Sequence, residues 1–218
     1  MIYNQDNSNL IIIEKKNEVY ITVDCESDIQ REISEFFTFY VPGYKFMPAF
    51  RNRMWDGKIR LFSQKTKEIY FGLYPYIKAF AEERGYNIVA GKDIDIDNKV
   101  DKEVVTKFSN SLGQKFEARD YQIDAIFHSL KRNRALLVSP TASGKSFIIY
   151  SLIRYYSHLI KEDVNNRILL IVPTTSLVEQ MYTDFESYGW NVKKYCHRLY
   201  SGYSNQTDKK VLISTWQS

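Results

Sequence analysis

The 218-residue chain carries a formal net charge of +4 and is 44% hydrophobic, 26% charged and 15% aromatic, values that exclude the charge excess and low hydrophobicity of intrinsic disorder. Cys25 and Cys196 lie far apart in sequence and form no Cys/His ligand spacing, so neither a disulfide framework nor a zinc site is predicted. The apolar run at residues 10–13 is too short for a secretion signal, and no stretch approaches the roughly 20 apolar residues of a membrane span.

The first half of the chain predicts a small α/β unit. Residues 18–24 alternate and are rich in β-branched side chains, which indicates a strand. Apolar residues recur at helical spacing over residues 29–37, and Ser27 with Gln30 forms the pattern of a capping box before them. The elements predicted next are strands at residues 57–63 and 67–73, a helix from residue 74 that ends at Gly85, and a short strand up to residue 90.

Residues 91–102, "GKDIDIDNKVDK", are acidic and nearly free of aromatic side chains. This composition favours a linker, although the alternation in "DIDID" leaves an exposed edge strand as the alternative. We therefore expect a small α/β domain at residues 1–92, a linker and connecting helix at 93–112, and a second domain at 113–218.

Strand and helix patterns alternate through the second half. The predicted elements are helices at residues 120–133, 144–160 and 176–189 and strands at residues 134–139, 167–173 and 209–215. Alternation of this kind is typical of βαβ crossovers and predicts an α/β fold with a parallel sheet covered by helices on both faces.

The stretch "LLVSPTASGKSFIIY" fits the phosphate-loop pattern G-x-x-x-x-G-K-[ST] at Gly144, Lys145 and Ser146, with Ser139 in place of the first glycine. A predicted strand precedes the loop and a predicted helix follows it, a frame that a chance Gly-Lys-Ser turn would lack. Backbone N–H groups and the helix N-terminus then bind phosphate, the lysine reaches the β and γ phosphates, and the hydroxyl binds Mg²⁺. The predicted nucleotide-binding residues are Pro140, Thr141, Ala142, Ser143, Gly144, Lys145 and Ser146, with Lys145 catalytic and Ser146 the Mg²⁺ ligand.

With Pro140 and Thr141 leading, the loop resembles that of superfamily 2 helicases. Upstream, "FEARDYQIDAI" resembles a segment of these motors in which the glutamine, here Gln122, contacts adenine and the arginine, here Arg119, lies near the base. An ordinary amphipathic helix start is the alternative for that segment taken alone. Downstream, "RILLIVPTTSLVEQM" and "VLISTWQS" resemble motifs Ia and Ic, which contact nucleic-acid phosphates. The residues that the resemblance assigns to nucleic acid are Pro173, Thr174, Thr175, Gln180 and Thr215.

The segments "VPTTSLVEQM", "STWQ" and "GYKFMPAFRNRMWDGKIRLF" are similar to the UvsW-type recombination helicases of T4-like phages. The resemblance implies a small N-terminal α/β domain followed by part of a RecA-like parallel-sheet P-loop domain. It also implies an ATP-dependent, Mg²⁺-dependent DNA helicase that remodels forks, Holliday junctions and R-loops in phage recombination and repair. The expected partners are branched DNA, single-stranded/duplex junctions, RNA–DNA hybrids and a second RecA-like lobe, and the expected location is the cytoplasm of the infected bacterium.

Basic and aromatic residues interleave between residues 44 and 67, where Asp56 is the only acid. Cations neutralise phosphates and planar side chains stack on exposed bases, so this stretch predicts nucleic-acid binding. The alternative places Phe46, Phe50 and Trp55 in the core of the small domain. It places Lys58 and Arg60 on the solvated face of a hairpin strand. The predicted nucleic-acid contacts are Arg51, Arg53, Trp55, Lys58 and Arg60.

ATP hydrolysis by such motors needs an Asp-Glu pair at the end of a further strand, where it holds Mg²⁺ and orients the attacking water. No such pair follows "STWQS", and the acids of "DIDID" and "YTDFES" do not follow a hydrophobic strand in the needed order. We therefore expect a RecA-like domain truncated before the Asp-Glu motif, which binds nucleic acid and ATP without turnover. A stand-alone nucleic-acid-binding module with no ATPase role is the alternative.

Overall fold

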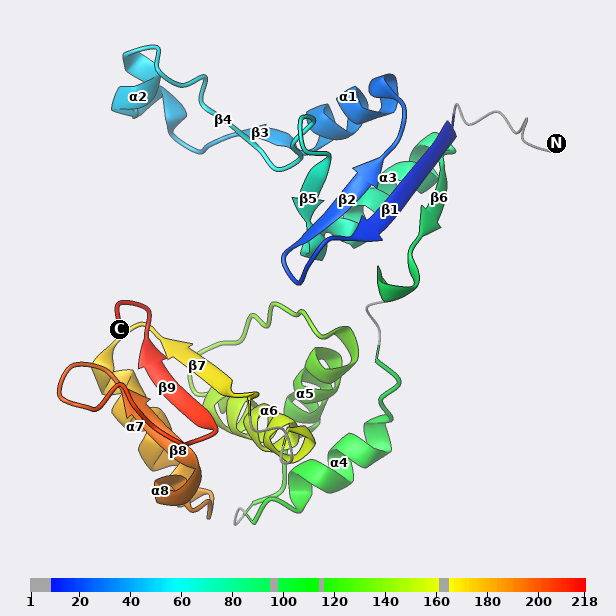
Figure 1. Cartoon of the computed structure of the whole chain (residues 1–218). Coiled ribbons are helices and arrows are strands. Elements are labelled where there is room, and N and C mark those ends of the chain that lie inside the picture. The colour runs from blue at the N-terminus through cyan, green and yellow to red at the C-terminus, as the bar shows by residue number, and fades with distance from the viewer. Residues whose placement is uncertain (1–8, 95–97, 114–115, 161–164) are drawn as a thin grey trace. The chain divides into compact units, whose positions relative to one another are not determined.

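The computed structural model describes residues 9–94, 98–113, 116–160 and 165–218. The chain divides into two compact units, Met1–Ile96 and Asp97–Ser218, each with its own hydrophobic core. Figure 1 shows the elements of the first unit in blue to green and those of the second unit in green to red.

The first unit is built on a sheet in the strand order β5-β2-β1-β6. Its central strand β1 runs antiparallel to β2 and parallel to β6, and β5 is antiparallel to β2. The strands and main helices of this unit are β1 (Leu10–Lys15), β2 (Tyr20–Asp24), α1 (Ser27–Phe36), β5 (Glu68–Tyr70), α3 (Tyr74–Arg84) and β6 (Asn87–Ala90).

Alternation along the strands builds the first core. Ile11 and Ile13 of β1 are fully buried and pack with Ile21 of β2 against Ile33 of α1 and Phe80 of α3. Because side chains alternate across a strand, the intervening residues face the other side of the sheet. The strand predicted at residues 18–24 and the helix predicted to end at Gly85 are confirmed.

The capping box predicted at Ser27 and Gln30 is wrong. Glu26 is the N-cap residue of α1, Ser27 is already helical, and no side chain caps the helix. The Gln30 amide instead donates to the Cys25 carbonyl oxygen at 2.7 Å. The side-chain donor thus satisfies a backbone acceptor just outside the helix, which a four-residue pattern does not distinguish from a cap.

A hairpin insertion, defined here as residues 38–60, extends from the first unit. Its strands β3 (Thr38–Tyr40) and β4 (Lys58–Arg60) are antiparallel, and between them lie the 3₁₀ turn η2 (Tyr44–Phe46) and the short helix α2 (Pro48–Arg51). Two further 3₁₀ turns in this unit are η3 (Phe71–Leu73) and η4 (Lys92–Ile94). The last turn occupies the start of the predicted linker and buries Ile94. Residues 95–97, at the centre of that linker, lie outside the described residues.

The second unit contains a parallel sheet in the order β7-β9-β8, which confirms the parallel sheet expected from the sequence. Its elements are α4 (Lys102–Asn110), α5 (Asp120–Arg132), α6 (Lys145–Leu159), β7 (Ile168–Val172), α7 (Thr175–Ser187), α8 (Val192–Tyr195), β8 (Cys196–Leu199) and β9 (Val211–Thr215). Strand β9 lies between the other two, as Figure 1 shows.

Within the described ranges, helices cover only one face of β7, so the expectation of cover on both faces is wrong for this strand. Ile168, Leu170 and Val172 belong to the core that α6 and α7 share. Leu169 and Ile171, which alternate with them, are each 55% exposed. The continuous apolar run of β7 is typical of a strand that is buried on both faces. In the described part of the chain, however, only one face of this strand is packed.

The buried strand predicted at residues 134–139 is also not found. This segment has no strand hydrogen bonds, and Leu136 and Val138 are 87% and 91% exposed. A strand exists only when a neighbouring strand supplies backbone partners. Strand β7 pairs with β9 alone among the described residues, so the segment at residues 134–139 has no strand partner there.

No helix within the described ranges combines the length and the hydropathy that a membrane crossing requires.

The two separate cores predict two separate stability responses. Replacing Phe80 by alanine removes a ring that is 1% exposed, and we expect it to cost the first unit about 3–5 kcal/mol. In hydrogen exchange, amides of β1, β2 and α3 should lose protection while amides of β7 and β9 keep theirs. Tyr76→Ala, on the exposed side of the same helix, is the control. Equal loss of protection in β9 would contradict two independent cores.

Candidate nucleotide and nucleic-acid sites

The phosphate-loop residues form a tight turn directly before α6. Gly144 is the N-cap residue of that helix and adopts φ +77°, a left-handed conformation that glycine accepts without strain. A Cβ on Gly144 would lie 2.3 Å from Nε2 of Gln122. The backbone conformation therefore favours glycine here, and any larger residue would also displace the Gln122 amide.

Lys145 closes this turn on itself. Its ammonium group donates to the carbonyl oxygens of Ser139 at 3.1 Å and Pro140 at 2.6 Å. The Ser143 hydroxyl donates to the Pro140 carbonyl at 2.9 Å and is hydrogen-bonded to the Ser139 hydroxyl. Serine at the position of the first glycine thus adds a side-chain link across the loop. The turn therefore keeps its shape through hydrogen bonds among its own residues.

The segment around Gln122 lies against the same turn. The Gln122 side chain is buried, its Oε1 accepts from the Arg119 backbone N–H at 3.0 Å, and its Nε2 donates to the Ser143 carbonyl at 3.2 Å. The Tyr121 hydroxyl donates to the same carbonyl at 3.0 Å. Arg119 and Gln122, separated from the loop by some twenty residues of sequence, are therefore brought into contact with it or lie directly beside it.

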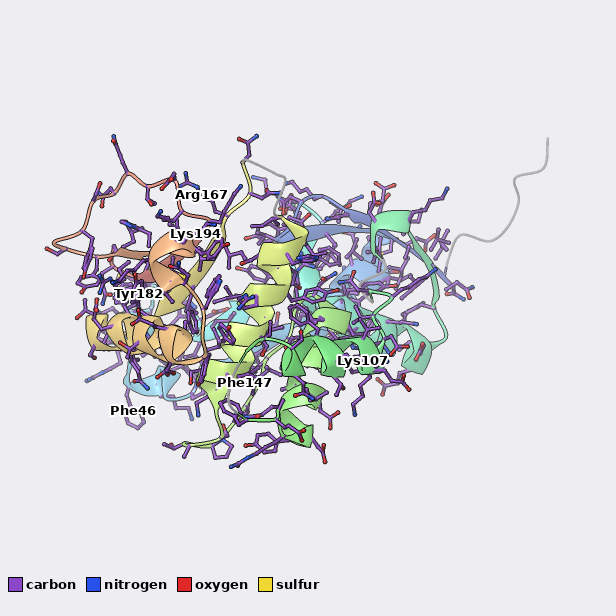
Figure 2. All side chains as sticks on the ribbon, turned by 90° about the horizontal axis from the view of Figure 1, so that it is seen from below. Phe46, Lys107, Phe147, Arg167, Tyr182 and Lys194 are labelled. Carbon is purple, nitrogen blue, oxygen red and sulfur yellow. The ribbon has the colours of Figure 1, made fainter. Side chains whose placement is uncertain are left out.

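Ser146 has a partner that the sequence did not indicate. Its hydroxyl is hydrogen-bonded to the hydroxyl of Tyr188 at 3.0 Å. The Tyr188 ring packs edge-on against Phe147, at 5.8 Å between ring centroids, and against Phe116 at 5.9 Å. Tyr188 follows the end of α7, and no local motif marks it. Figure 2 labels Phe147 at the start of α6, where this aromatic contact begins.

Parallel pairing of β7 and β9 brings the two predicted nucleic-acid motifs together. Val172 is paired with Thr215, so the chain leaves both strands at the same edge of the sheet. A groove of 770 Å³ lies there. The residues that line it are Pro173, Thr174, Thr175, Tyr200, Ser201, Tyr203, Asn205, Thr215, Gln217 and Ser218.

Two of the predicted residues, Thr174 and Thr215, form hydrogen bonds that stabilise the fold around this groove. The Thr174 hydroxyl caps α7 by accepting from the Leu177 N–H at 3.4 Å, and the buried Thr215 hydroxyl is bonded to that of Ser218 at 2.8 Å. Gln180 is exposed on α7 and does not line the groove. The loop from Tyr200 to Asn205, which forms one wall, was missed from the sequence because it carries no repeating pattern.

Glu179 holds that wall in place. Its carboxylate accepts from Nη1 of Arg198 at 2.6 Å and from the Tyr200 hydroxyl at 2.6 Å. The Arg198 guanidinium also lies 4.4 Å from the ring centroid of Tyr182 and 4.5 Å from that of Tyr203. The hydrogen bond from Tyr200, followed by that from Arg198, lowers the pKa of Glu179, and the same bond raises the pKa of Tyr200. Tyr182 is labelled in Figure 2 on α7, the helix that supplies both Glu179 and this ring.

The predicted basic residues of the first unit separate into two groups. Arg51, Arg53 and Trp55 line a cavity of 590 Å³, together with Lys45, Phe50, Met54 and Asp56. Lys58 and Arg60 lie on β4 beside a different, 340 Å³ cavity. Arg60 is ion-paired with Asp56, and the hydrogen bond between them lowers the pKa of Asp56. Lys58 lies 4.9 Å from the Tyr40 ring centroid.

Trp55 is held by its own hairpin. Its Nε1 donates to the Lys58 carbonyl at 2.9 Å and its ring is only partly exposed. The alternative interpretation of this stretch is wrong for its aromatic residues: Phe46 is 85% exposed, and neither Phe50 nor Trp55 belongs to the first core. Phe62, which it did not include, is buried there. Within the described ranges, no group of three or more His, Cys, Asp and Glu side chains could hold a metal ion.

In comparison with known proteins, one family model matches within each of the two units of the chain. The family described as "DNA helicase UvsW, N-terminal" matches residues 11–91, and the family "Type III restriction enzyme, res subunit" matches residues 115–218. The "ATP-dependent DNA helicase uvsW" of Enterobacteria phage T4 is 33% identical over 208 residues, which are 91% of this chain and 40% of that protein. Two crystal structures of UvsW from bacteriophage T4 are similar at a TM-score of 0.82 with 32% and 33% identity. They match 95% of this chain and 75% and 43% of the solved chains.

The mixed α/β architecture, the parallel sheet and the phosphate loop before α6 define a RecA-like P-loop domain preceded by a small α/β domain. The chain belongs to the UvsW helicase family and corresponds to the N-terminal portion of its members. It spans 40% of the length of the curated T4 relative.

The Glu179 contacts predict a pH-dependent contribution to stability. The folded-state pKa of Glu179 lies below the ordinary value of 4.5, so the stabilisation is complete above that value and is lost as the pH falls through the lower one. We expect Glu179→Gln to lower the free energy of unfolding by about 1 kcal/mol at neutral pH, since the group is partly exposed. The urea midpoints of the wild type and of Glu179→Gln should differ at about pH 7 and converge at about pH 3.

Glu186→Gln is the matched control, because Glu186 is exposed on the same helix. A wild-type advantage over Glu179→Gln that persists unchanged in acid would show that the carboxylate is not the stabilising group.

Proposed function

We propose that this chain is the N-terminal part of an ATP-dependent DNA helicase that remodels branched DNA. The substrates proposed are forks, Holliday junctions and R-loops, and the setting is phage recombination and repair in the cytoplasm of the infected bacterium. One observation carries the proposal: the Gln122 segment, the phosphate loop and a groove between two strand ends belong to a single unit. A second RecA-like lobe would complete the motor in the longer protein.

The residues of the phosphate loop fit a Mg²⁺-bound nucleoside triphosphate. The ammonium group of Lys145 already lies against two carbonyl oxygens of the loop, where an anionic phosphate is a stronger partner. Gly144 leaves room for close approach at the N-terminus of the 15-residue helix α6. Ser146 would supply a hydroxyl ligand to Mg²⁺, and Gln122 with Arg119 would contact the base. The bound nucleotide supplies the phosphoanhydride whose hydrolysis drives a motor of this kind.

The groove at the strand ends fits a nucleic-acid backbone. Most of the residues that line it carry a hydroxyl or an amide group, Thr175, Ser201, Asn205 and Gln217 among them. Such neutral donors bind phosphate oxygens and fix the position of a strand without selecting its sequence. Tyr200 and Tyr203 add planar surfaces at the same place, and we propose that they contact the tracked strand together with Pro173, Thr174 and Thr215.

We propose further that the 218-residue chain binds nucleotide without turnover. Among the described residues, no carboxylate forms a hydrogen bond or an ion pair with Lys145 or Ser146. A water molecule attacking the γ phosphate needs such a group to orient it. The same observation supports a second candidate, a nucleic-acid-binding module with no ATPase role, and nucleotide binding distinguishes the two.

Removing the Lys145 ammonium should weaken Mg²⁺-ATP binding. A hydrogen bond to a charged group contributes about 1.5–3 kcal/mol, so we expect Lys145→Ala to lower the affinity by roughly 10- to 100-fold in calorimetric titration. Lys78→Ala, an exposed lysine on α3, is the control. Unchanged affinity in Lys145→Ala would favour the second candidate. Sustained phosphate release by the wild-type chain that Lys145→Ala abolishes would contradict binding without turnover.

Removing cations from the hairpin insertion should flatten the salt dependence of DNA binding. Each lost phosphate contact lowers the slope of log K against log salt by roughly 0.7–0.9. We expect Arg51→Ala with Arg53→Ala to lower the slope by up to twice that amount, measured by fluorescence anisotropy on a fork. Arg60→Ala should have a smaller effect because Arg60 is already paired with Asp56. A slope equal to that of the wild type would exclude Arg51 and Arg53 as phosphate contacts.

A further inference from the structure

Most aromatic side chains of the hairpin insertion hold the insertion itself together. The Tyr44 ring is stacked on Tyr40 with centroids 4.6 Å apart and meets Phe50 edge-on at 4.8 Å. Gly57, at φ +79°, lies beneath it, and a Cβ there would come within 2.3 Å of the Tyr44 ring. Trp55 is fixed by its hydrogen bond to the Lys58 carbonyl. These contacts make the insertion a shaped platform.

Two large apolar side chains on this platform are more exposed than its other apolar side chains. Phe46 is 85% exposed and Met54 is 74% exposed. Phe46 has no ring contact with another aromatic residue in the described chain, and Figure 2 shows it projecting from its segment. The backbone behind both is fixed, because the Phe46 N–H donates to the Gly43 carbonyl at 2.9 Å and the Met54 N–H to the Ala49 carbonyl at 2.9 Å. Both apolar side chains are therefore available to contact a partner, and the charges beside them indicate which kind.

The charges around these side chains indicate the partner. Met54 lines the 590 Å³ cavity together with Lys45, Arg51 and Arg53, and Lys45 directly precedes Phe46. The only acid on this cavity, Asp56, is paired with Arg60 from β4. An apolar protein surface would leave three cations without compensation, whereas a polyanion satisfies them. Nucleic acid offers both features, since it presents phosphates outside and apolar base faces inside.

We propose that Phe46 and Met54 form an apolar wedge that enters the base stack of branched DNA at the branch point. Lys45, Arg51 and Arg53 hold the flanking phosphates. A branch point is the favoured place because its bases are already partly unstacked, so insertion there costs less than in a continuous duplex. Trp55 supports the wedge from inside the hairpin and does not itself stack on a base. This proposal rests on the proposed binding of branched DNA and adds the contact that recognises the branch.

The test uses the 218-residue chain and a Y-shaped fork with 2-aminopurine at the branch point, whose fluorescence rises when the base unstacks. We expect the wild-type chain to raise this fluorescence. The double variant Phe46→Ala with Met54→Ala should lose most of the rise at saturating protein and bind the fork about tenfold more weakly. Its affinity for a fully paired duplex should change less than about twofold, since phosphate contacts dominate there.

Two further variants sharpen the test. Phe46→Trp keeps a planar apolar side chain and should retain the fluorescence rise. Tyr76→Ala removes an exposed aromatic side chain from α3 in the same unit and should leave both measurements unchanged. Both sites of the double variant are exposed, so its thermal midpoint should match that of the wild type.

The outcomes separate the wedge from the function on which it rests. Fork binding without a fluorescence rise, or a rise that survives in the double variant, overturns the wedge and leaves DNA binding intact. Failure of the wild-type chain to bind either DNA overturns the proposed function and the wedge with it.

Discussion

The parallel register between β7 and β9 determines where the groove of the second unit lies. Pairing of Val172 with Thr215 delivers both chain exits to one edge of the sheet. The turn after β7 then becomes the start of α7, which Thr174 caps. A shift of the register by one residue would turn Ile168 and Leu170 out of the core and move Thr215 away from the turn. The groove therefore depends on the burial of the β7 side chains that α6 and α7 cover.

Helix α7 connects the groove to the phosphate loop. Glu179, one turn into the helix, holds the Tyr200 wall of the groove, while Tyr188, just past its end, is bonded to Ser146. These two contacts are separated by about 14 Å along the helix axis, at about 1.5 Å per residue. A rigid element thus touches both sites through a hydroxyl or a carboxylate. The phosphate loop and the wall of the groove thus share one supporting helix.

The periodicity of apolar residues was sufficient to predict most helices and strands, but it was insufficient to predict which strands pair. Helices α3, α5, α6 and α7 and strands β2, β7 and β9 were predicted because their apolar spacing is regular. Strand β8, "CHRL", was missed because its side chains are half polar and it becomes a strand only through β9. The opposite error occurred at residues 134–139, where the apolar pattern is strong and no described strand pairs with it. Hydrogen-bond partners distant in sequence decide both cases.

The site shows the same limit at the level of single side chains. The phosphate loop and the Gln122 segment are contiguous motifs, so the sequence was enough to find them. Tyr188 and the Tyr200 loop act through contacts with Ser146 and Glu179, which no spacing rule connects.

The hairpin insertion gives the sharpest example of this limit. Trp55 and Phe46 both lie among basic and aromatic residues in the sequence. In the structure, Trp55 is fixed by its hydrogen bond to the Lys58 carbonyl, whereas Phe46 is exposed. Tyr44 fills the space over Gly57 and stacks on Tyr40, and no spacing rule in the sequence shows that this ring packs inward while Phe46 stays exposed.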